Sequence, residues 1–360
     1  MRRYIIALAL LVLSATPARA QEELLQSCAR AAPSQSVPEP VGDQFRFLCA
    51  QVVHAVGNVQ PSVGIAFSGG NPVLGTGSTL GRRMGVFPRI SVSARANVAL
   101  ADVPDIFDGY SAQIGDGAER LGAVQAVGAP VASIQGDIAI GLFNGLSLGP
   151  AVGGFGAVDL LGSVAFVPRF EEAGLTDAIT NIGAGARIGL LQQGLIAPGI
   201  SVSAMYRRMG EVSFGDVSAG DPGAFSSDLR TLSLRGVVSK GILLFDLAVG
   251  AGYDRYTSDM QLDWLLTCAT SECLSANGGS AVTLRGDIAG EMTTAAWNVF
   301  GNFSLNLLML HLVGEVGYQK SMEPITLDDL RNAGLPEQPY TTEALEGGRL
   351  FGSVGLRISL

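Results

Sequence analysis

An alternation of apolar and polar side chains runs through most of the chain after residue 88. From 89 to 100, the even-numbered positions carry Ile, Val, Ala, Ala, Val and Leu, whereas the odd-numbered positions up to 97 carry Arg, Ser, Ser, Arg and Asn. A period of two residues indicates a β-strand with one apolar face. The pattern recurs at 131–143, 182–190, 200–208, 243–254, 295–306, 310–319 and 349–360, and less regularly at 155–167 and 229–238.

The connections between these ten segments alternate in length. Short ones occupy 144–154, 192–198, 239–241 and 306–308, and long ones occupy 101–130, 168–180, 209–228, 258–293 and 321–348. Short turns at one end and long loops at the other are typical of outer-membrane barrels. We therefore predict an all-β fold: a transmembrane antiparallel up-and-down β-barrel over 87–360, with ten strands counted and ten to fourteen allowed. A soluble secreted β-protein is the alternative, but such a protein is not expected to place its short turns at one end and its long loops at the other.

Composition supports a membrane environment. Charged residues make up only 15% of the 360 residues, AVILMFWYC make up 48%, and glycine occurs 48 times. A chain this apolar is not disordered, because disorder requires low hydrophobicity and high net charge. The net charge of −9 argues against a nucleic-acid partner.

Residues 1–20 have the features of a secretory signal peptide. Two arginines precede an apolar run from Tyr4 to Leu13, and the segment ends in Ala18-Arg19-Ala20. No later segment reaches the ~18 consecutive apolar residues of a spanning helix. An exported apolar chain of this kind is expected in the bacterial outer membrane, with the membrane lipid as its partner.

Four cysteines fall into two local pairs in an oxidising compartment. Cys28 and Cys49 flank an N-terminal segment, and Cys268 and Cys273 lie in one predicted loop, so two local disulfides are expected. Free or differently paired thiols are the alternative. The spacing of these cysteines suggests no metal site.

The C-terminus resembles the assembly signal of outer-membrane barrels. Gly355, Ile358 and Leu360 occupy the characteristic positions, although Leu360 stands where an aromatic residue is usual. The barrel assembly machinery is therefore an expected partner. A periplasmic C-terminus would place the long loops outside the cell. Aromatic residues make up only 7% of the chain, so the aromatic girdles should be sparse.

The segment 21–86 precedes the first strand and is expected to be helical or irregular up to about residue 60. A Gly/Pro-rich passage that begins with Gly69-Gly70-Asn71-Pro72 and reaches Gly81 then leads into the barrel. The Asn71-Pro72 step, the position of this segment and the C-terminal barrel together resemble the long-chain fatty-acid transporter family. That resemblance implies a plug-like N-terminal segment. The family has fourteen strands, so a full correspondence would require further strands within 101–130 and 258–293.

Charged side chains on the polar strand faces are predicted to line the lumen, because an arginine facing lipid at mid-depth costs ~2–4 kcal/mol. They either set a field across an open pore or pair with one another in a closed lumen. The residues are Arg89, Arg95, Asp137, Arg187, Asp246, Asp254, His311, Glu315, Arg349 and Arg357.

Sequence chemistry gives little support to catalysis, metal binding or a cofactor. The chain has only two histidines, His54 and His311, which restricts acid–base catalysis near neutral pH. Asp102, Asp105 and Asp108 miss the spacing of a calcium loop. The glycines of 183–189 alternate with apolar residues within a strand and more simply leave room on the lumen side. We expect no enzyme activity, no cofactor and no metal.

These inferences predict a channel or passive transporter for small solutes, hydrophobic ones among them, with the lumen residues as its binding candidates. The alternative is a closed structural or adhesive barrel that acts through its long extracellular loops.

Overall fold

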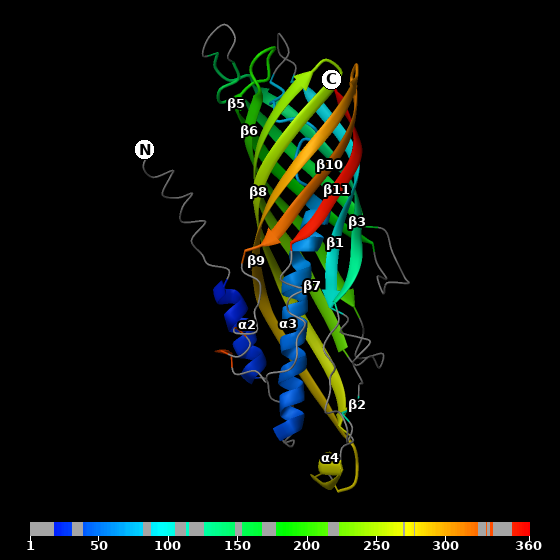
Figure 1. The fold of residues 1–360 in the computed structure, drawn as a ribbon. Helices are drawn as coiled ribbons and strands as arrows, with labels where there is room; N and C mark the ends of the chain where they lie inside the picture. The colour runs from blue at the N-terminus through cyan, green and yellow to red at the C-terminus, as the bar shows by residue number, and fades with distance from the viewer. Residues whose placement is uncertain are drawn as a thin grey trace, which may run out of the picture.

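The computed structural model describes most of the chain from residue 18 onward (Figure 1). The described ranges are 18–30, 39–81, 88–104, 113–114, 126–147, 153–167, 178–214, 223–268, 271–276, 278–322, 329, 332–333 and 348–360.

Ten antiparallel strands within these ranges form a closed up-and-down barrel, as predicted. Each strand pairs with the next in the barrel, the β1–β11 pairing joins the first strand to the last, and the β8–β9 pairing completes the ring. The strands are β1 (Ile90–Pro104), β3 (Ala126–Phe143), β4 (Val158–Val167), β5 (Ile179–Leu191), β6 (Gly199–Phe214), β7 (Gly223–Ile242), β8 (Phe245–Cys268), β9 (Val282–Leu307), β10 (Leu310–Ser321) and β11 (Arg349–Ser359).

Smaller elements lie outside this ring. The two-residue strand β2 (Gln113–Ile114) pairs in parallel with the last residues of β8. Helices α2 (Ala18–Arg30) and α3 (Glu39–Ser68) precede the barrel, and α4 (Ser271–Ala276) lies between β8 and β9. Among the described helices, none combines the length and the apolar composition needed to cross a membrane.

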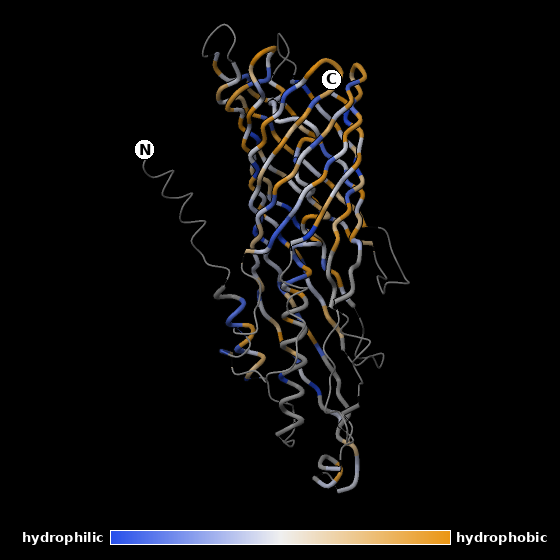
Figure 2. Tube along the Cα trace, viewed as in Figure 1, coloured by the Kyte–Doolittle hydropathy of each residue, from blue (hydrophilic) through white to orange (hydrophobic). Residues whose placement is uncertain are grey.

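Side chains alternate between lipid and lumen along the strands. On β1, Val92 and Val98 are exposed, whereas Ser93, Arg95 and Asn97 between them are buried. Figure 2 shows that apolar residues gather in the part of the barrel nearest the C-terminus. An outward apolar band over a polar interior is the surface of a transmembrane barrel, and the protein is an outer-membrane β-barrel.

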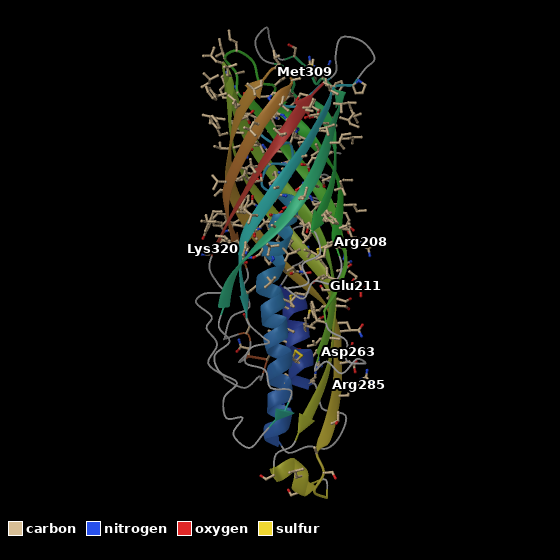
Figure 3. The ribbon with its side chains drawn as sticks, turned by 90° about the vertical axis from the view of Figure 1, so that its right-hand side faces the viewer. Arg208, Glu211, Asp263, Arg285, Met309 and Lys320 are labelled. Atoms are coloured by element: carbon tan, nitrogen blue, oxygen red, sulfur yellow. A yellow bond between two sulfur atoms is a disulfide. The ribbon has the colours of Figure 1, made fainter. Side chains whose placement is uncertain are left out.

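The height of the band matches a bilayer. Met309 marks the end with the short turns, and Lys320 and Arg208 lie at one level at the other edge of the band (Figure 3). Met309 lies in the turn before β10 and Lys320 lies on β10, eleven residues further on. This separation corresponds to about 28 Å along the axis at ~3.3 Å per residue and a tilt of ~40°. Glu211, Asp263 and Arg285 lie beyond this edge (Figure 3).

Several strands are longer than the sequence pattern predicted. Most of the expected loop 258–293 is strand, because β8 continues to Cys268 and β9 begins at Val282. These extensions carry outward acids such as Asp259 and Glu291, so the apolar alternation is lost outside the bilayer. The expected loop 209–228 is likewise shortened by the ends of β6 and β7. The described part of 258–293 adds no strand that crosses the band.

Two of the short turns also lie beyond their expected positions. The β7–β8 turn is at 243–244 rather than 239–241, and the β9–β10 turn is at 308–309. Leu243 and Leu308 adopt positive φ angles of 55° and 60° there, where Asn or Gly is usual. Their side chains are 98% and 99% exposed, so these turn tips continue the apolar surface to the end of the barrel.

Candidate functional site: the occupied lumen

The N-terminal segment passes through the barrel from the end opposite the C-terminus (Figure 1). At that end, Arg349 of β11 donates a hydrogen bond to the carbonyl oxygen of Asn58 in α3 at 3.2 Å. At the other end, Gly81 lies against Gly141 of β3. The last turns of α3 and residues 69–81 therefore occupy the lumen over its length.

Local sequence explains how the helix stops inside the barrel. Gly69 has φ of +60° and its N–H donates to the carbonyl of Ile65 at 2.8 Å, which is a left-handed glycine cap. The side-chain oxygen of Asn71 then accepts a hydrogen bond from the N–H of Val73 at 3.2 Å. This turn, and a second one in which the N–H of Thr76 donates to the carbonyl of Val73 at 3.2 Å, direct the chain along the lumen.

Glu315 of β10 holds the centre of the segment. Its two carboxylate oxygens accept hydrogen bonds from the main-chain N–H groups of Gly70 and Asn71, each at 2.8 Å. Asn302 of β9 donates to Glu315 at 2.8 Å and accepts from the Asn71 side chain at 2.7 Å. All four residues are buried, so the carboxylate is compensated mainly by fixed amide dipoles.

Two arginines from opposite parts of the barrel hold the same turn. Arg95 of β1 donates to the carbonyls of Ser68 and Asn71, each at 3.0 Å. Arg235 of β7 donates to the carbonyl of Gly70 at 2.9 Å.

Each of these arginines also has a carboxylate partner. The Nε atom of Arg95 is 3.2 Å from Asp137 of β3, and Arg235 is 2.8 Å from Asp254 of β8. The side chains in both pairs are at most 6% exposed. Such desolvated pairs keep their geometry only when their remaining polar atoms are also bonded, and the segment supplies acceptors for the arginines.

A third ion pair lies toward the turn end of the barrel. Arg187 of β5 and Asp159 of β4 are 2.7 Å apart, and Asp159 also accepts from the N–H of Leu80 at 3.1 Å. Arg357 of β11 donates to the carbonyl of Leu74 at 2.6 Å.

The space between segment and wall is filled. Ile65 packs with Phe300 and Phe351, and Phe67 packs with Tyr256. Between Gly69–Gly70 and the arginines of β6 and β7, the remaining gap has no room for a water molecule.

Close approach of main chains depends on glycine at the turn end. A Cβ atom on Gly141 would overlap the carbonyl oxygen of Gly81. Because this neighbour is backbone rather than a flexible side chain, any larger residue at position 141 must displace the segment.

Outside the band, the N-terminal helices pack beside the long strands (Figure 1). Cys28 of α2 and Cys49 of α3 form a disulfide, as predicted, and both are fully buried. Leu24 of α2 lies over Gly290 of β9. We refer to α2, the part of α3 before Asn58 and the outer ends of β7–β9 as the outer module. The side chains of Cys268 and Cys273 lie outside the described part of the chain.

Most of the predicted lumen residues do face the interior. Arg95, Asp137, Arg187, Asp254, Glu315, Arg349 and Arg357 are buried within the barrel. Asp246 and His311 are half-buried near the turn end, where Asn306 donates to Asp246 at 2.8 Å and lies 2.6 Å from the ring of His311. Arg89 precedes β1 and is exposed, and its side chain donates to the carbonyl of Leu80 at 3.3 Å, so it contacts the segment at the turn end and is not buried within the barrel.

Sequence reasoning missed four buried residues of the lumen. Asp159, Arg207, Arg235 and Asn302 were all on polar strand faces, and Arg207 donates to Ser233 at 3.2 Å. The two-residue alternation could have identified the arginines. On β7, Thr231, Ser233 and Arg235 occupy alternate positions of one face, and on β6, Ser201, Ser203 and Arg207 share one face.

Catalytic and metal sites gain no support from the arrangement. Residues 145–149 match the G-x-S-x-G pattern, but Ser147 lies in the connection between two strands, and not at the strand-to-helix turn that this motif requires. Among the described residues, no three His, Cys, Asp or Glu side chains are grouped to hold a metal ion. Asp105 and Asp108 lie outside the described ranges. The absence of enzyme activity stays a prediction.

No protein family and no curated protein matches the sequence. Solved structures similar to this one include the outer membrane protease OmpT from Escherichia coli, with 11% identity, 76% of this chain and 96% of that chain covered, and a TM-score of 0.32.

Two others are the translocator domain of the autotransporter NalP from Neisseria meningitidis (11% identity, 87% and 98% covered, TM-score 0.35) and a FadL homologue from Pseudomonas aeruginosa (11% identity, 82% and 97% covered, TM-score 0.24). At these identities the similarities concern the fold alone.

Proposed function

We propose that the protein is a closed outer-membrane barrel that anchors and displays the outer module on the cell surface. This is the closed-barrel interpretation of the sequence, with the N-terminal helices added to the long strands as the displayed part. The observation that carries the proposal is the occupation of the lumen by the chain's own segment.

The lumen contacts support a permanently filled interior. Glu315, Arg95 and Arg235 each bond the main chain of the Gly70 turn while keeping other buried partners. Removing the segment would take away the main-chain hydrogen bonds of these three charged groups, and a hydrogen bond to a charged group contributes about 1.5–3 kcal/mol. A solute channel would lose these hydrogen bonds whenever the segment left the lumen.

The position of the outer module supports display. The C-terminus and the short turns lie at one end of the band, and α2, α4 and the outer ends of β8 and β9 lie beyond the other (Figure 1). With a periplasmic C-terminus, these elements face the outside of the cell. The disulfide between α2 and α3 supports this location, because disulfides persist in oxidising compartments such as the cell surface.

Two measurements test the proposal together. The full chain in planar bilayers should show no steady conductance. An epitope inserted between α2 and α3, within residues 31–38, should bind antibody on intact cells, whereas an epitope in the connection at 192–198 should not.

A steady conductance of the full chain would favour the channel or passive transporter predicted from the sequence. Antibody access only after the cells are opened would overturn display. If bacteria that carry the protein bind to host cells or other surfaces, and this binding is lost when the outer module is shortened, the displayed part acts as an adhesin.

A further inference from the structure

The barrel wall contacts the threaded segment through its main chain. Arg95, Arg235 and Arg357 donate to carbonyl oxygens of residues 68–74, and Ser304 and Arg187 reach the carbonyls of Gly75 and Thr76. Carboxylates of the wall accept from the N–H groups of residues 70, 71 and 80. Donors for carbonyls and acceptors for N–H groups therefore face the segment from residue 68 to residue 76 and again at residue 80.

Side chains of residues 69–81 also contact the wall. Asn71 bonds to Asn302, the Ser78 hydroxyl accepts from the N–H of Gln193 at 3.1 Å, and Val73 packs with Leu161 and Met205. The segment contains five glycines, at 69, 70, 75, 77 and 81. The glycines expose the peptide groups that the wall bonds. At Gly70 an added Cβ would collide with the ring of Phe300, and at Gly75 it would collide with Ser304. The wall thus selects a chain with small residues at these positions.

The recognising groups are held in place by the barrel itself. Asp137, Asp254 and Asp159 pair with Arg95, Arg235 and Arg187 across neighbouring strands. Each ion pair joins two residues of the wall, so each arginine has a carboxylate partner that does not belong to the segment. A site whose groups are fixed in advance binds with a smaller entropic cost than one that must be ordered by its ligand.

We propose that the lumen is a binding site for a non-helical polypeptide segment rich in small residues, recognised largely through its main chain, and that residues 69–81 are its tethered occupant. The same segment binds when it is supplied as a separate peptide. This inference rests on the proposed function, since it explains how the closed state is held, and it adds a ligand class to the lumen.

The first experiment severs the tether in the folded protein. A protease site placed within 82–87 is cut in detergent, and the retention of the N-terminal fragment is followed by gel filtration. The fragment is expected to stay bound. Glu315→Gln should release it about tenfold faster or more, because a charged acceptor of two main-chain N–H groups is lost. The outer module is identical in both proteins, so a difference in release reports the lumen.

The second experiment supplies the segment in trans. A variant without residues 21–81 that still shows heat-modifiable migration should conduct in planar bilayers, and a synthetic peptide of residues 58–81 should reduce that conductance. The same peptide with Gly70→Val and Gly75→Val should not. If the deletion variant does not fold, the peptide is instead used to displace the cut fragment.

Equal release from the two cut proteins, together with no effect of the peptide, would overturn the proposal. Failure of the proposed function has a different signature: the uncut full chain would conduct, or the epitope in the outer module would be inaccessible on intact cells.

Discussion

Glu315 and Asn71 meet at the centre of the barrel, where a carboxylate oxygen of Glu315 accepts a hydrogen bond from the main-chain N–H of Asn71 at 2.8 Å. The second oxygen accepts from the N–H of Gly70 at the same distance. A single wall residue thereby fixes the point at which helix α3 ends and the non-helical segment begins.

Replacing Glu315 by Gln should loosen the segment without dissolving the barrel. The amide has one acceptor oxygen, and its NH₂ group would face one of the two N–H donors. We expect a loss of about 1.5–3 kcal/mol in unfolding free energy, the range for hydrogen bonds to charged groups. The measurement is denaturant unfolding in lipid vesicles, with Glu211→Gln beyond the band as the control. Equal midpoints for the two variants would contradict this role of Glu315.

Gly141 should tolerate no side chain. Gly141→Ala places a methyl group on the carbonyl oxygen of Gly81, and relieving that overlap should cost about 1–3 kcal/mol. Gly136→Ala on the same strand is the matched control, because its Cβ would have only ordinary contacts with Val164 and Ser93. Transient conductance steps in planar bilayers should appear for Gly141→Ala alone. Their absence, with an unchanged unfolding midpoint, would show that the segment does not pack tightly there.

The alternation of side chains revealed both the barrel and much of its interior. The placement of Arg95, Asp137 and Glu315 was correct, because alternate residues of a barrel strand face lipid and lumen in turn. Arg207 was missed although the same rule applies. Arg208 follows it directly, so only the odd or even position in the strand distinguishes the buried Arg207 from the exposed Arg208.

The path of the N-terminal segment was less accessible to sequence reasoning. Its contacts are made by peptide groups, which every residue carries, so Gly69 and Gly70 mark a turn without showing what surrounds it. The outer ends of β8 and β9 were read as loop because no bilayer imposes a one-sided pattern there. The turns at Leu243 and Leu308 lack the Asn or Gly that usually marks a two-residue hairpin.

The buried pair Arg235–Asp254 should be far more sensitive than an exposed pair. Asp254 is fully buried and also accepts from Asn298 at 2.7 Å. Asp254→Asn leaves the Arg235 charge buried without its counter-charge, which should cost about 3–5 kcal/mol. Asp259→Asn removes a 67% exposed partner of Arg230 and should cost no more than ~1 kcal/mol. Unfolding midpoints in vesicles compare the two, and similar losses would mean that the lumen is hydrated.

The disulfide should stabilise the outer module and leave the barrel unaffected. Cys28 and Cys49 are 21 residues apart, and a cross-link closing a loop of that size contributes about 3 kcal/mol. In the double variant Cys28→Ser, Cys49→Ser, protease should cleave α2 faster while heat-modifiable migration stays the same. Reductant should reproduce this in the wild-type protein and have no further effect on the variant. Unchanged cleavage would show that contacts such as Leu24 on Gly290 hold α2 without the cross-link.

A charge in the apolar band should destabilise the barrel according to its depth. Val316 is 65% exposed on β10, between Met309 and Lys320, so its side chain faces hydrocarbon. Val316→Arg should therefore cost about 2–4 kcal/mol in lipid vesicles, as expected for arginine near the midplane. Ala289→Arg is the control, because Ala289 is also exposed but lies on the outer end of β9, where water is available. Equal effects at both positions would mean that the bilayer does not lie where the apolar band places it.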